Sequence, residues 1–133
     1  GVAATRHIGT RAPDTVTVEG RPYSLQQGKV LVYFFDPECL HCLEAARRMA
    51  AYNWGETRVL VAPVQQERLA QTFLQDSGLR AAVTSDAALL RKTFHFAGVP
   101  AAVAIENGHQ VKALTQFDGQ QPGPVLKELD FIR

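Results

Sequence analysis

The chain has 133 residues, of which 46% are hydrophobic and 20% are charged, and its formal net charge at pH 7 is +1. This length and composition fit a single globular domain over residues 1–133, large enough to bury a core. The small net charge and the scattered basic residues argue against a dedicated nucleic-acid surface, and no apolar run approaches the ~20 residues that a membrane-spanning helix needs.

The beginning of the chain bears on location. Residues 1–4 form too short a stretch to be a secretory signal peptide, and they lack its hydrophobic segment. The chain starts with Gly1, and its only methionine is Met49. We therefore interpret it as a processed form or a fragment, and we leave open an upstream signal or membrane anchor that has been cut away.

The first elements are predicted to be a lead-in, a hairpin and a buried strand. Residues 1–13 mix small, polar and charged types and are expected to be extended. Two short strands, 16–18 and 23–25, flank the turn residues 19–22 and predict a hairpin. The apolar run 29–35 predicts a strand that is buried on both faces.

The rest of the chain alternates helices and strands and closes with a hairpin and a helix. Helix formers at core-facing spacing predict the helices, and Gly, Pro and Asn mark the breaks. In order, we predict a helix at about 40–52, a strand at 58–62, a helix at 65–75, a strand at 81–83, a helix capped by Asp86 that runs to Thr93, strands at 101–105 and 109–114, and a helix at 125–132.

Three breaks between these elements have specific turn chemistry. Gly55 is expected to provide a left-handed cap after the first helix, and Gly78 to end the second. Asn107-Gly108 predicts a type I′ hairpin turn. The alternation of strands and helices implies parallel pairing, and the late hairpin adds antiparallel strands. The predicted fold is α/β, a mixed central sheet with helices on both faces.

The only two cysteines, Cys39 and Cys42, lie where the buried strand ends and a helix begins. Such a Cys-x-x-Cys pair has three interpretations: a redox dithiol, half of a zinc site, or a structural disulfide. A structural zinc site needs four ligands, usually with a second Cys or His pair, and the chain offers no second cysteine pair. A disulfide across so short a loop stabilises little. The context favours the redox dithiol, with a metal site or inert cysteines as alternatives.

The two cysteines are expected to have different roles. Cys39 is predicted in the first helical turn, where unpaired N–H groups and the helix dipole favour a thiolate. Cys42 follows one turn later, within bonding distance but less exposed. We therefore expect Cys39 to attack and Cys42 to resolve, through a Cys39–Cys42 disulfide. A protonated His41 would further stabilise the Cys39 thiolate, and the alternative is a solvated histidine without an electrostatic role.

Three segments resemble thioredoxin-like proteins. Residues 32–42, with both cysteines, look like the active-site strand and helix of that superfamily. Residues 98–101, Gly-Val-Pro-Ala, look like its cis-proline loop just before a strand. Residues 12–30 are similar to the N-terminal hairpin of the TlpA/ResA-like redoxin branch. The cysteine pair together with the Gly-Val-Pro loop is the specific part of this resemblance.

The resemblance implies a thioredoxin-like fold, a mixed central β-sheet flanked by helices with an N-terminal β-hairpin extension. It also implies that Pro100 is cis and abuts the dithiol, and that the backbone of Val99 binds a substrate strand. The alternative for Pro100 is an ordinary trans proline at the start of a strand.

Two features depart from the family pattern. Thioredoxins carry a buried aspartate where this chain has Tyr33, so that acid's proton-transfer role is unfilled, with Glu38 and Glu44 as candidates for part of it. Glu38 is also expected, with His41, to tune the Cys39 thiolate. The second departure is the Leu-His pair between the cysteines. Its histidine, like the valine before Pro100, resembles the oxidising DsbA group and leaves the direction of electron flow open.

The leading prediction is a thiol–disulfide oxidoreductase that acts on protein cysteines without a bound cofactor or metal. The resemblance implies cysteine-containing protein substrates and a redox partner that is thioredoxin-like or a membrane protein. The resembled branch is extracytoplasmic and often membrane-tethered. We therefore expect a bacterial periplasmic or cell-envelope location, with a cytoplasmic one left open.

A copper-binding module is the alternative from another class. Some thioredoxin-fold proteins bind copper through two cysteines and a distant histidine, and thiolates suit Cu(I). The ligands here would be Cys39, Cys42 and His95, although those proteins usually place three residues between the cysteines, against two here. A pure interaction domain with an incidental dithiol is a weaker, third alternative.

Overall fold

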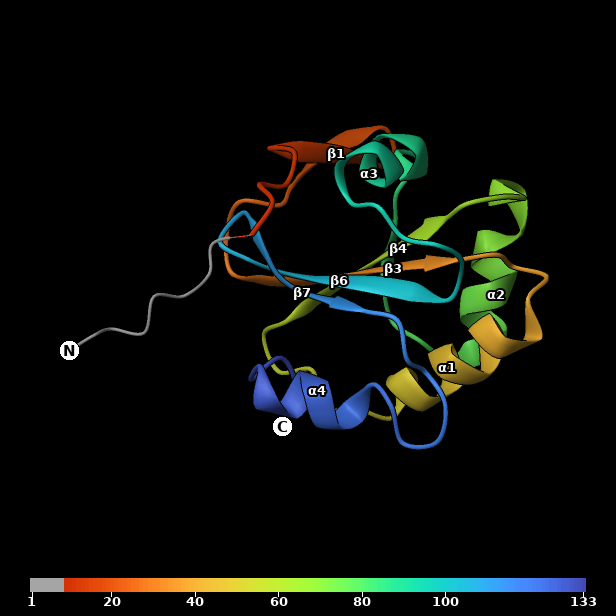
Figure 1. The fold of residues 1–133 in the computed structure, drawn as a ribbon. Helices are drawn as coiled ribbons and strands as arrows, with labels where there is room; N and C mark the ends of the chain where they lie inside the picture. The colour runs from red at the N-terminus through yellow and green to blue at the C-terminus, as the bar shows by residue number, and fades with distance from the viewer. Residues whose placement is uncertain (1–8) are drawn as a thin grey trace.

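Strand β3 (Lys29–Phe35) is the central strand of the protein in the computed structural model, which describes residues 9–133 (Figure 1). Its residues from Val30 to Phe35 are completely buried, as predicted for a strand with both faces covered. The sheet has five strands in the order β5-β4-β3-β6-β7. The other four strands are β4 (Arg58–Pro63), β5 (Ala82–Val83), β6 (Ala101–Glu106) and β7 (His109–Leu114).

The central strand joins a parallel half of the sheet to an antiparallel half. β4 runs parallel to β3, with Val32 opposite Leu60, and β5 continues that half. β6 runs antiparallel to β3, with Val32 opposite Val103, and β7 pairs antiparallel with β6. The mixed sheet expected from the order of the elements is confirmed.

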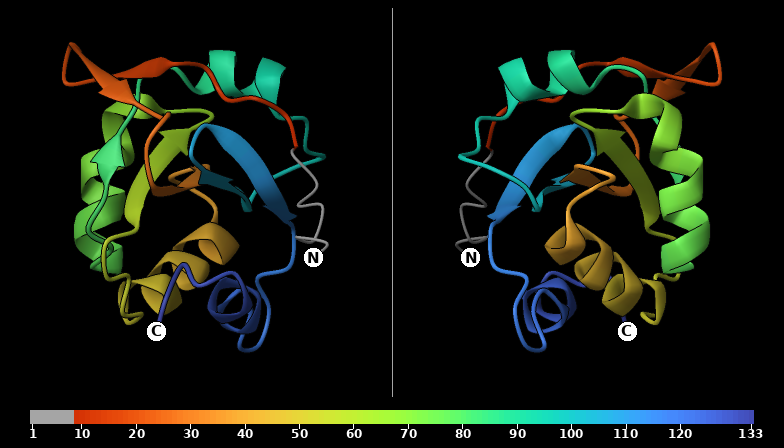
Figure 2. Two further views of the ribbon diagram at one scale, coloured as in Figure 1. Left: turned by 90° about the vertical axis from the view of Figure 1, so that its left-hand side faces the viewer. Right: turned by 90° about the vertical axis from the view of Figure 1, so that its right-hand side faces the viewer.

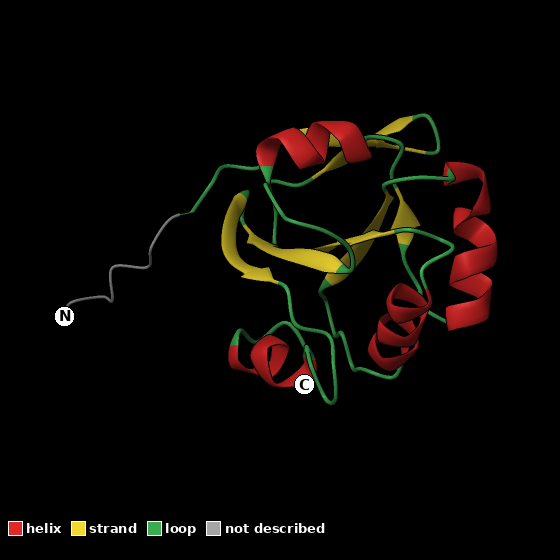
Figure 3. Ribbon diagram, turned by 45° about the vertical axis from the view of Figure 1, so that its right-hand side comes forward, coloured by secondary structure: helices red, strands yellow, loops and turns green. Residues whose placement is uncertain are grey.

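One face of the sheet is covered by α1 (Leu40–Ala50), α2 (Ala70–Ser77) and α4 (Gly123–Glu128). Because side chains alternate along a strand, the odd-numbered residues of β3 point to this face, where they pack in one apolar cluster with all three helices. Figure 1 shows α1 and α4 below the sheet with α2 to one side, and Figure 3 shows the same helices in red around the yellow strands.

The opposite face is covered by α3 (Ala87–Thr93) and a separate two-stranded hairpin of β1 (Thr15–Val18) and β2 (Arg21–Ser24). The even-numbered residues of β3 pack here with Val16 and Leu90. Figure 2 shows this hairpin and α3 on the side of the sheet away from α1 and α4. Helices on both faces and the N-terminal hairpin extension are thus as predicted.

Asp86 joins the hairpin to the main body instead of capping α3 with its side chain. Its Oδ2 accepts a hydrogen bond of 2.6 Å from the backbone N–H of Thr17, and α3 has no side-chain cap bond. Thr84 reinforces this link because its hydroxyl donates to the carbonyl of Thr17 at 2.8 Å. Asp86 is therefore the N-cap residue of a helix that runs to Thr93, as predicted, but its carboxylate bonds to another segment instead of to the N–H groups of α3.

The first helix ends two residues earlier than predicted. α1 stops at Ala50 because the N–H groups of Ala51 and Tyr52 bond to carbonyls three residues back, which tightens the last turn. Gly55 has a left-handed φ of 55°, but it lies beyond this end and does not cap the helix.

The second helix begins later and ends later than predicted. A 3₁₀ turn at Glu67–Leu69 precedes it, and α2 runs from Ala70 to Ser77. Gly78 then adopts a left-handed φ of 77°, and its N–H donates to the Leu74 carbonyl. The predicted stop at this glycine is confirmed.

The last helix was predicted to reach residue 132 but ends at Glu128. Asp130 takes a left-handed φ of 60°, and the N–H of Phe131 donates to the carbonyl of Leu126 at 2.9 Å. This arrangement is a Schellman motif, which turns the chain back and satisfies the helix carbonyls. It buries Phe131 against the apolar cluster, so a buried contact stops the helical pattern.

The turn between β6 and β7 has the predicted type I′ geometry, because Asn107 and Gly108 have φ angles of 49° and 85°. The Asn107 side chain also accepts a hydrogen bond of 2.9 Å from the N–H of Gly28. This turn lies at the end of the sheet where β3 begins, away from the cysteines.

The described part of the predicted lead-in runs along this turn. Ala12 N–H donates to the Gly108 carbonyl, and Gln110 N–H donates to the Thr10 carbonyl, both at 2.8 Å. The remainder of the predicted lead-in, residues 1–8, lies outside the described residues. Within residues 9–133, every helix falls short of the length and apolar character that crossing a bilayer would need.

Candidate functional site

Cys39 is the N-cap residue of α1, at the carboxyl end of β3. The turn before it is shaped by Asp36, whose Oδ1 accepts from the Glu38 N–H at 2.9 Å and whose carbonyl accepts from the Cys39 N–H at 3.0 Å. Cys39 has extended backbone angles, and its Sγ accepts a hydrogen bond of 3.1 Å from the Cys42 N–H. The sulfur thus occupies the position of a capping oxygen, where helix N–H groups stabilise negative charge.

The two cysteines differ in exposure. Both are free thiols; Cys39 is half-buried, whereas Cys42 is fully buried. Burial first, and then the Cys39 thiol beside it, raise the pKa of Cys42 to about 12. Cys42 is therefore held as a neutral thiol beneath a partly accessible Cys39.

Tyr33, which replaces the acid of the thioredoxin pattern, lies directly under the dithiol. Its hydroxyl donates to the Cys42 carbonyl at 2.7 Å, and the whole side chain is buried. Burial is the main reason that the Tyr33 pKa is raised well above its usual range, with further contributions from Cys42 and Cys39. Tyr33 carries a polar group among the apolar side chains of β3 that face α1. Its place in the alternation of the strand was the sequence signal that could have indicated a contact with the cysteine helix.

His41 is exposed on α1 and contacts a distant loop. Its Nε2 lies 3.1 Å from Oδ1 of Asp118, an ion pair when the imidazole is protonated. Asp118 lies between β7 and α4. Nothing in the sequence points to this partner, and a role for His41 in tuning the thiolate stays a prediction.

Glu38 is exposed and pairs with the loop before α2. Its Oε1 accepts a hydrogen bond from Nε2 of Gln66, a residue with left-handed backbone angles. The contact ties the turn before Cys39 to the neighbouring β4–α2 connection. Its predicted influence on the Cys39 thiolate is not tested by this geometry.

The Gly-Val-Pro loop reaches the same end of the sheet as the dithiol. The Val99–Pro100 peptide bond is cis, as expected. Ala101 pairs with Phe34 of β3, so Pro100 comes beside the end of the strand that leads to Cys39. Val99 is half-buried and packs against the same apolar cluster as Cys39. The cysteine pair and the Gly-Val-Pro loop therefore lie at the same end of the sheet, where β3 ends and β6 begins.

The copper ligand set is not brought together. Within residues 9–133, no three His, Cys, Asp or Glu side chains are grouped so that they could hold a metal ion. His95 is exposed in the loop after α3, and it does not join the two cysteines.

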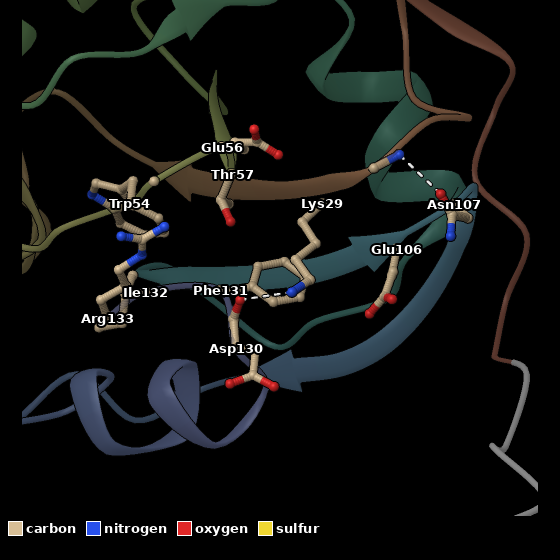
Figure 4. Close-up of a pocket in the computed structure, with 12 residues that line it drawn as sticks. Lys29, Trp54, Glu56, Thr57, Glu106, Asn107, Asp130, Phe131, Ile132 and Arg133 are labelled. Carbon is tan, nitrogen blue, oxygen red and sulfur yellow. Dashed lines mark hydrogen bonds between the residues drawn. The ribbon is translucent and has the colours of Figure 1, made fainter. Parts of the chain in front are cut away.

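A separate pocket lies away from the cysteines, at the end of the sheet where β3 begins (Figure 4). It has a volume of ≈ 360 Å³, and its lining includes Lys29, Trp54, Asn107 and Arg133. Lys29 Nζ donates to the Asp130 carbonyl at 2.7 Å there. Neither the cysteines nor the Gly-Val-Pro loop lines this pocket, so it is not part of the site.

Comparison with known proteins identifies the fold of the chain through solved structures and not through sequence. No family model matches the chain, and no curated protein matches it in sequence. The solved structure of a candidate protein disulfide isomerase from Bacteroides thetaiotaomicron superposes with a TM-score of 0.74 at 19% identity, over 95% of this chain and 89% of that one.

Two further solved structures resemble the chain at similar identity. A secreted disulfide oxidoreductase of Mycobacterium tuberculosis, described as homologous to E. coli DsbE, has a TM-score of 0.68 at 17% identity, over 86% of this chain and 91% of its own. StoA from Bacillus subtilis has a TM-score of 0.64 at 17% identity, over 96% of this chain and 98% of its own. The chain has the thioredoxin-like fold that these solved structures share.

Proposed function

We propose that this protein is a thiol–disulfide oxidoreductase that exchanges disulfides with cysteine-containing protein substrates. The observation that carries the proposal is the asymmetric pair of thiols: Cys39 caps a helix and is partly accessible, while Cys42 is fully buried one turn behind it. Such a pair separates an attacking sulfur from a resolving sulfur.

The proposed exchange has two steps. The Cys39 thiolate attacks one sulfur of a substrate disulfide, so that a Cys39–substrate disulfide forms and the other substrate sulfur leaves as a thiolate. Cys42 then gives up its proton, which is taken by the substrate thiolate released in the first step, and attacks Cys39 Sγ, which forms the Cys39–Cys42 disulfide and releases the second substrate thiolate. The substrate gains two electrons and the protein dithiol loses them; the reverse sequence oxidises a substrate.

The remaining roles follow from position. We assign substrate binding to Val99 and Pro100, because their loop lies at the end of β3 that leads to the dithiol. His41 and Glu38 are assigned to tuning of the Cys39 thiolate. A TlpA/ResA-like role outside the cytoplasm, with a thioredoxin-like or membrane redox partner, fits the likeness to a secreted oxidoreductase.

The proposal is tested by trapping the intermediate. A Cys42→Ser variant, incubated with oxidised glutathione or a disulfide-containing protein such as insulin, should accumulate a mixed disulfide on Cys39, identified by mass spectrometry. The matched Cys39→Ser variant should form none, because its remaining thiol is buried. Equal labelling of the two variants, or no adduct in either, would contradict the proposal.

The direction of electron flow is decided by one equilibrium. The reduction potential of the Cys39–Cys42 pair is measured against glutathione. A value of roughly −270 mV indicates a reductase, and one of roughly −120 mV indicates an oxidant.

A further inference from the structure

The Tyr33 hydroxyl is fixed in place beneath Cys42. The Tyr33 ring is stacked near Phe35, with 6.0 Å between ring centroids and 3° between planes, and lies 5.7 Å from the Phe117 ring. The side chain is completely buried, and its hydroxyl donates to the Cys42 carbonyl at 2.7 Å. Because the ring has little freedom to move, the oxygen stays beside Cys42.

Besides burial, the Cys42 side chain is among the groups that raise the Tyr33 pKa, so the Tyr33 hydroxyl, held at the Cys42 carbonyl, is near enough to the thiol to act on it. A hydroxyl has one hydrogen and two lone pairs, so rotation about the C–O bond moves the hydrogen from the carbonyl toward the sulfur. The hydroxyl can therefore donate to the Cys42 carbonyl while the Cys42 thiol is neutral, and to the sulfur when it is a thiolate.

Among the described residues, the side chains of Cys39 and Asp36 both add to the effect of burial in raising the Cys42 pKa, and so disfavour its thiolate. The backbone of Asp36 acts in the opposite direction, since as a hydrogen-bond partner it lowers this pKa. Arg48 is close enough to act on Tyr33, but its Nη1 donates to the carbonyls of Phe117 and Gln121 at 2.6 and 3.0 Å. Tyr33 is thus the side chain next to Cys42 that can donate a hydrogen bond to its thiolate, in addition to the Asp36 backbone.

The proposed exchange needs such a donor at one moment. Cys42 becomes a thiolate just before it attacks Cys39, and it leaves as a thiolate when another thiol attacks the Cys39–Cys42 disulfide at Cys39. A buried anion without a hydrogen-bond partner is strongly disfavoured. The high pKa of Tyr33 keeps its hydroxyl protonated and able to donate.

We propose that Tyr33 is a catalytic residue: its hydroxyl donates a hydrogen bond to the transient Cys42 thiolate while the Cys39–Cys42 disulfide forms or breaks. This inference rests on the proposed oxidoreductase function. It assigns no proton transfer to Tyr33, which keeps its hydrogen throughout.

The test uses Tyr33→Phe, which keeps the ring packing and removes the oxygen. Reduced protein is mixed with increasing oxidised glutathione, quenched with acid at set times and analysed by mass spectrometry. Formation of the Cys39 adduct should keep the wild-type rate, while its conversion to the Cys39–Cys42 disulfide should slow about 10- to 100-fold, the factor expected for one hydrogen bond to a charged group. The adduct should then accumulate.

A second measurement separates this role from loss of packing. Cys42 is not a thiolate in either stable end state near neutral pH, so the glutathione equilibrium of Tyr33→Phe should stay at the wild-type value while the forward and reverse rates fall together. Tyr52→Phe is the matched control, because its hydroxyl lies near the Gln120 carbonyl at 3.5 Å; it should leave both rates unchanged.

The outcomes are distinguishable. If Tyr33→Phe converts the Cys39 adduct to the Cys39–Cys42 disulfide at the wild-type rate, the inference is overturned, whether or not the glutathione equilibrium shifts. The proposed function still stands in that case. Failure of wild type and Cys42→Ser to form any Cys39 adduct overturns the proposed function, and this inference with it.

Discussion

His41 Nε2 lies 3.1 Å from Asp118 Oδ1, which connects the dipeptide between the cysteines to the loop that precedes α4. The two residues are far apart in the chain. Their side chains are 46% and 91% exposed, so solvent and salt screen the pair. The contact gives α1 a charged neighbour without burying it.

The His41–Asp118 pair predicts a small change in Cys39 reactivity. Asp118→Asn removes the ion-pair partner of His41, so the variant should slow alkylation of Cys39 by iodoacetamide at low salt. The expected change is at most about fivefold, because exposed ion pairs are worth at most about 1 kcal/mol. High salt should remove the difference. Asp14→Asn, which breaks the exposed pair with Arg11, should have no effect; faster alkylation of Asp118→Asn would contradict the prediction.

The buried thiol predicts selective labelling. Because Cys42 is fully buried and its pKa is raised to about 12, a brief pulse of iodoacetamide at neutral pH should alkylate Cys39 alone. Both cysteines should react when the same pulse is given in denaturant. Peptide mass spectrometry reads the two sites separately, and substantial labelling of Cys42 in the folded protein is the contrary result.

The same thiol predicts a pH-dependent loss of stability in the reduced protein. The folded-state pKa of Cys42 is raised from 9.0 to about 12, chiefly by burial, so the fold favours the neutral thiol. Its contribution is fully present below pH 9 and is lost as the pH rises toward 12, by up to about 1.4 kcal/mol per pH unit. Urea unfolding of wild type and Cys42→Ala should give a constant difference at neutral pH and a shrinking one above pH 9. Tyr33 and Tyr52, whose pKa values are also raised, are present in both proteins.

The hydrogen bond between Asp86 and Thr17 predicts that loss of the Asp86 carboxylate loosens the N-terminal hairpin. Asp86→Ala removes the acceptor for the Thr17 N–H and should destabilise the hairpin by about 1.5–3 kcal/mol, the range for a hydrogen bond to a charged group. Amide hydrogen exchange should speed up at Thr17 and stay unchanged in the middle of β3. Asp76→Ala, on the exposed side of α2, is the control; uniform acceleration across the sheet would show that the link supports the whole fold.

The β6–β7 turn predicts a change in stability that is separable from activity. Gly108 has a φ of 85°, and an added Cβ would lie 2.3 Å from Oε1 of Gln26, so Gly108→Ala should lower the thermal unfolding temperature. Because the turn lies at the end of the sheet away from the cysteines, adduct formation on Cys39 should keep the wild-type rate well below the unfolding temperature. A reduced rate in the folded variant would instead couple this end of the sheet to the site.

Local sequence determined most of the elements and the position of Cys39 at the start of α1. The apolar run of β3, the turn at Asp36-Pro37 and the helix formers after Cys39 act within a few residues, so their outcome follows from local propensity and periodicity. The Asn107-Gly108 turn is equally local, since it depends on two residues that tolerate positive φ.

Tertiary structure alone decided which residues lie next to the two cysteines. Register placed the Tyr33 hydroxyl under Cys42, strand pairing placed Pro100 beside the end of β3, and loop packing gave His41 its partner Asp118. It also stopped α4 at Glu128, where burial of Phe131 outweighs the helical pattern. These contacts join residues distant in the chain, and their energies depend on burial and geometry that no short sequence window contains.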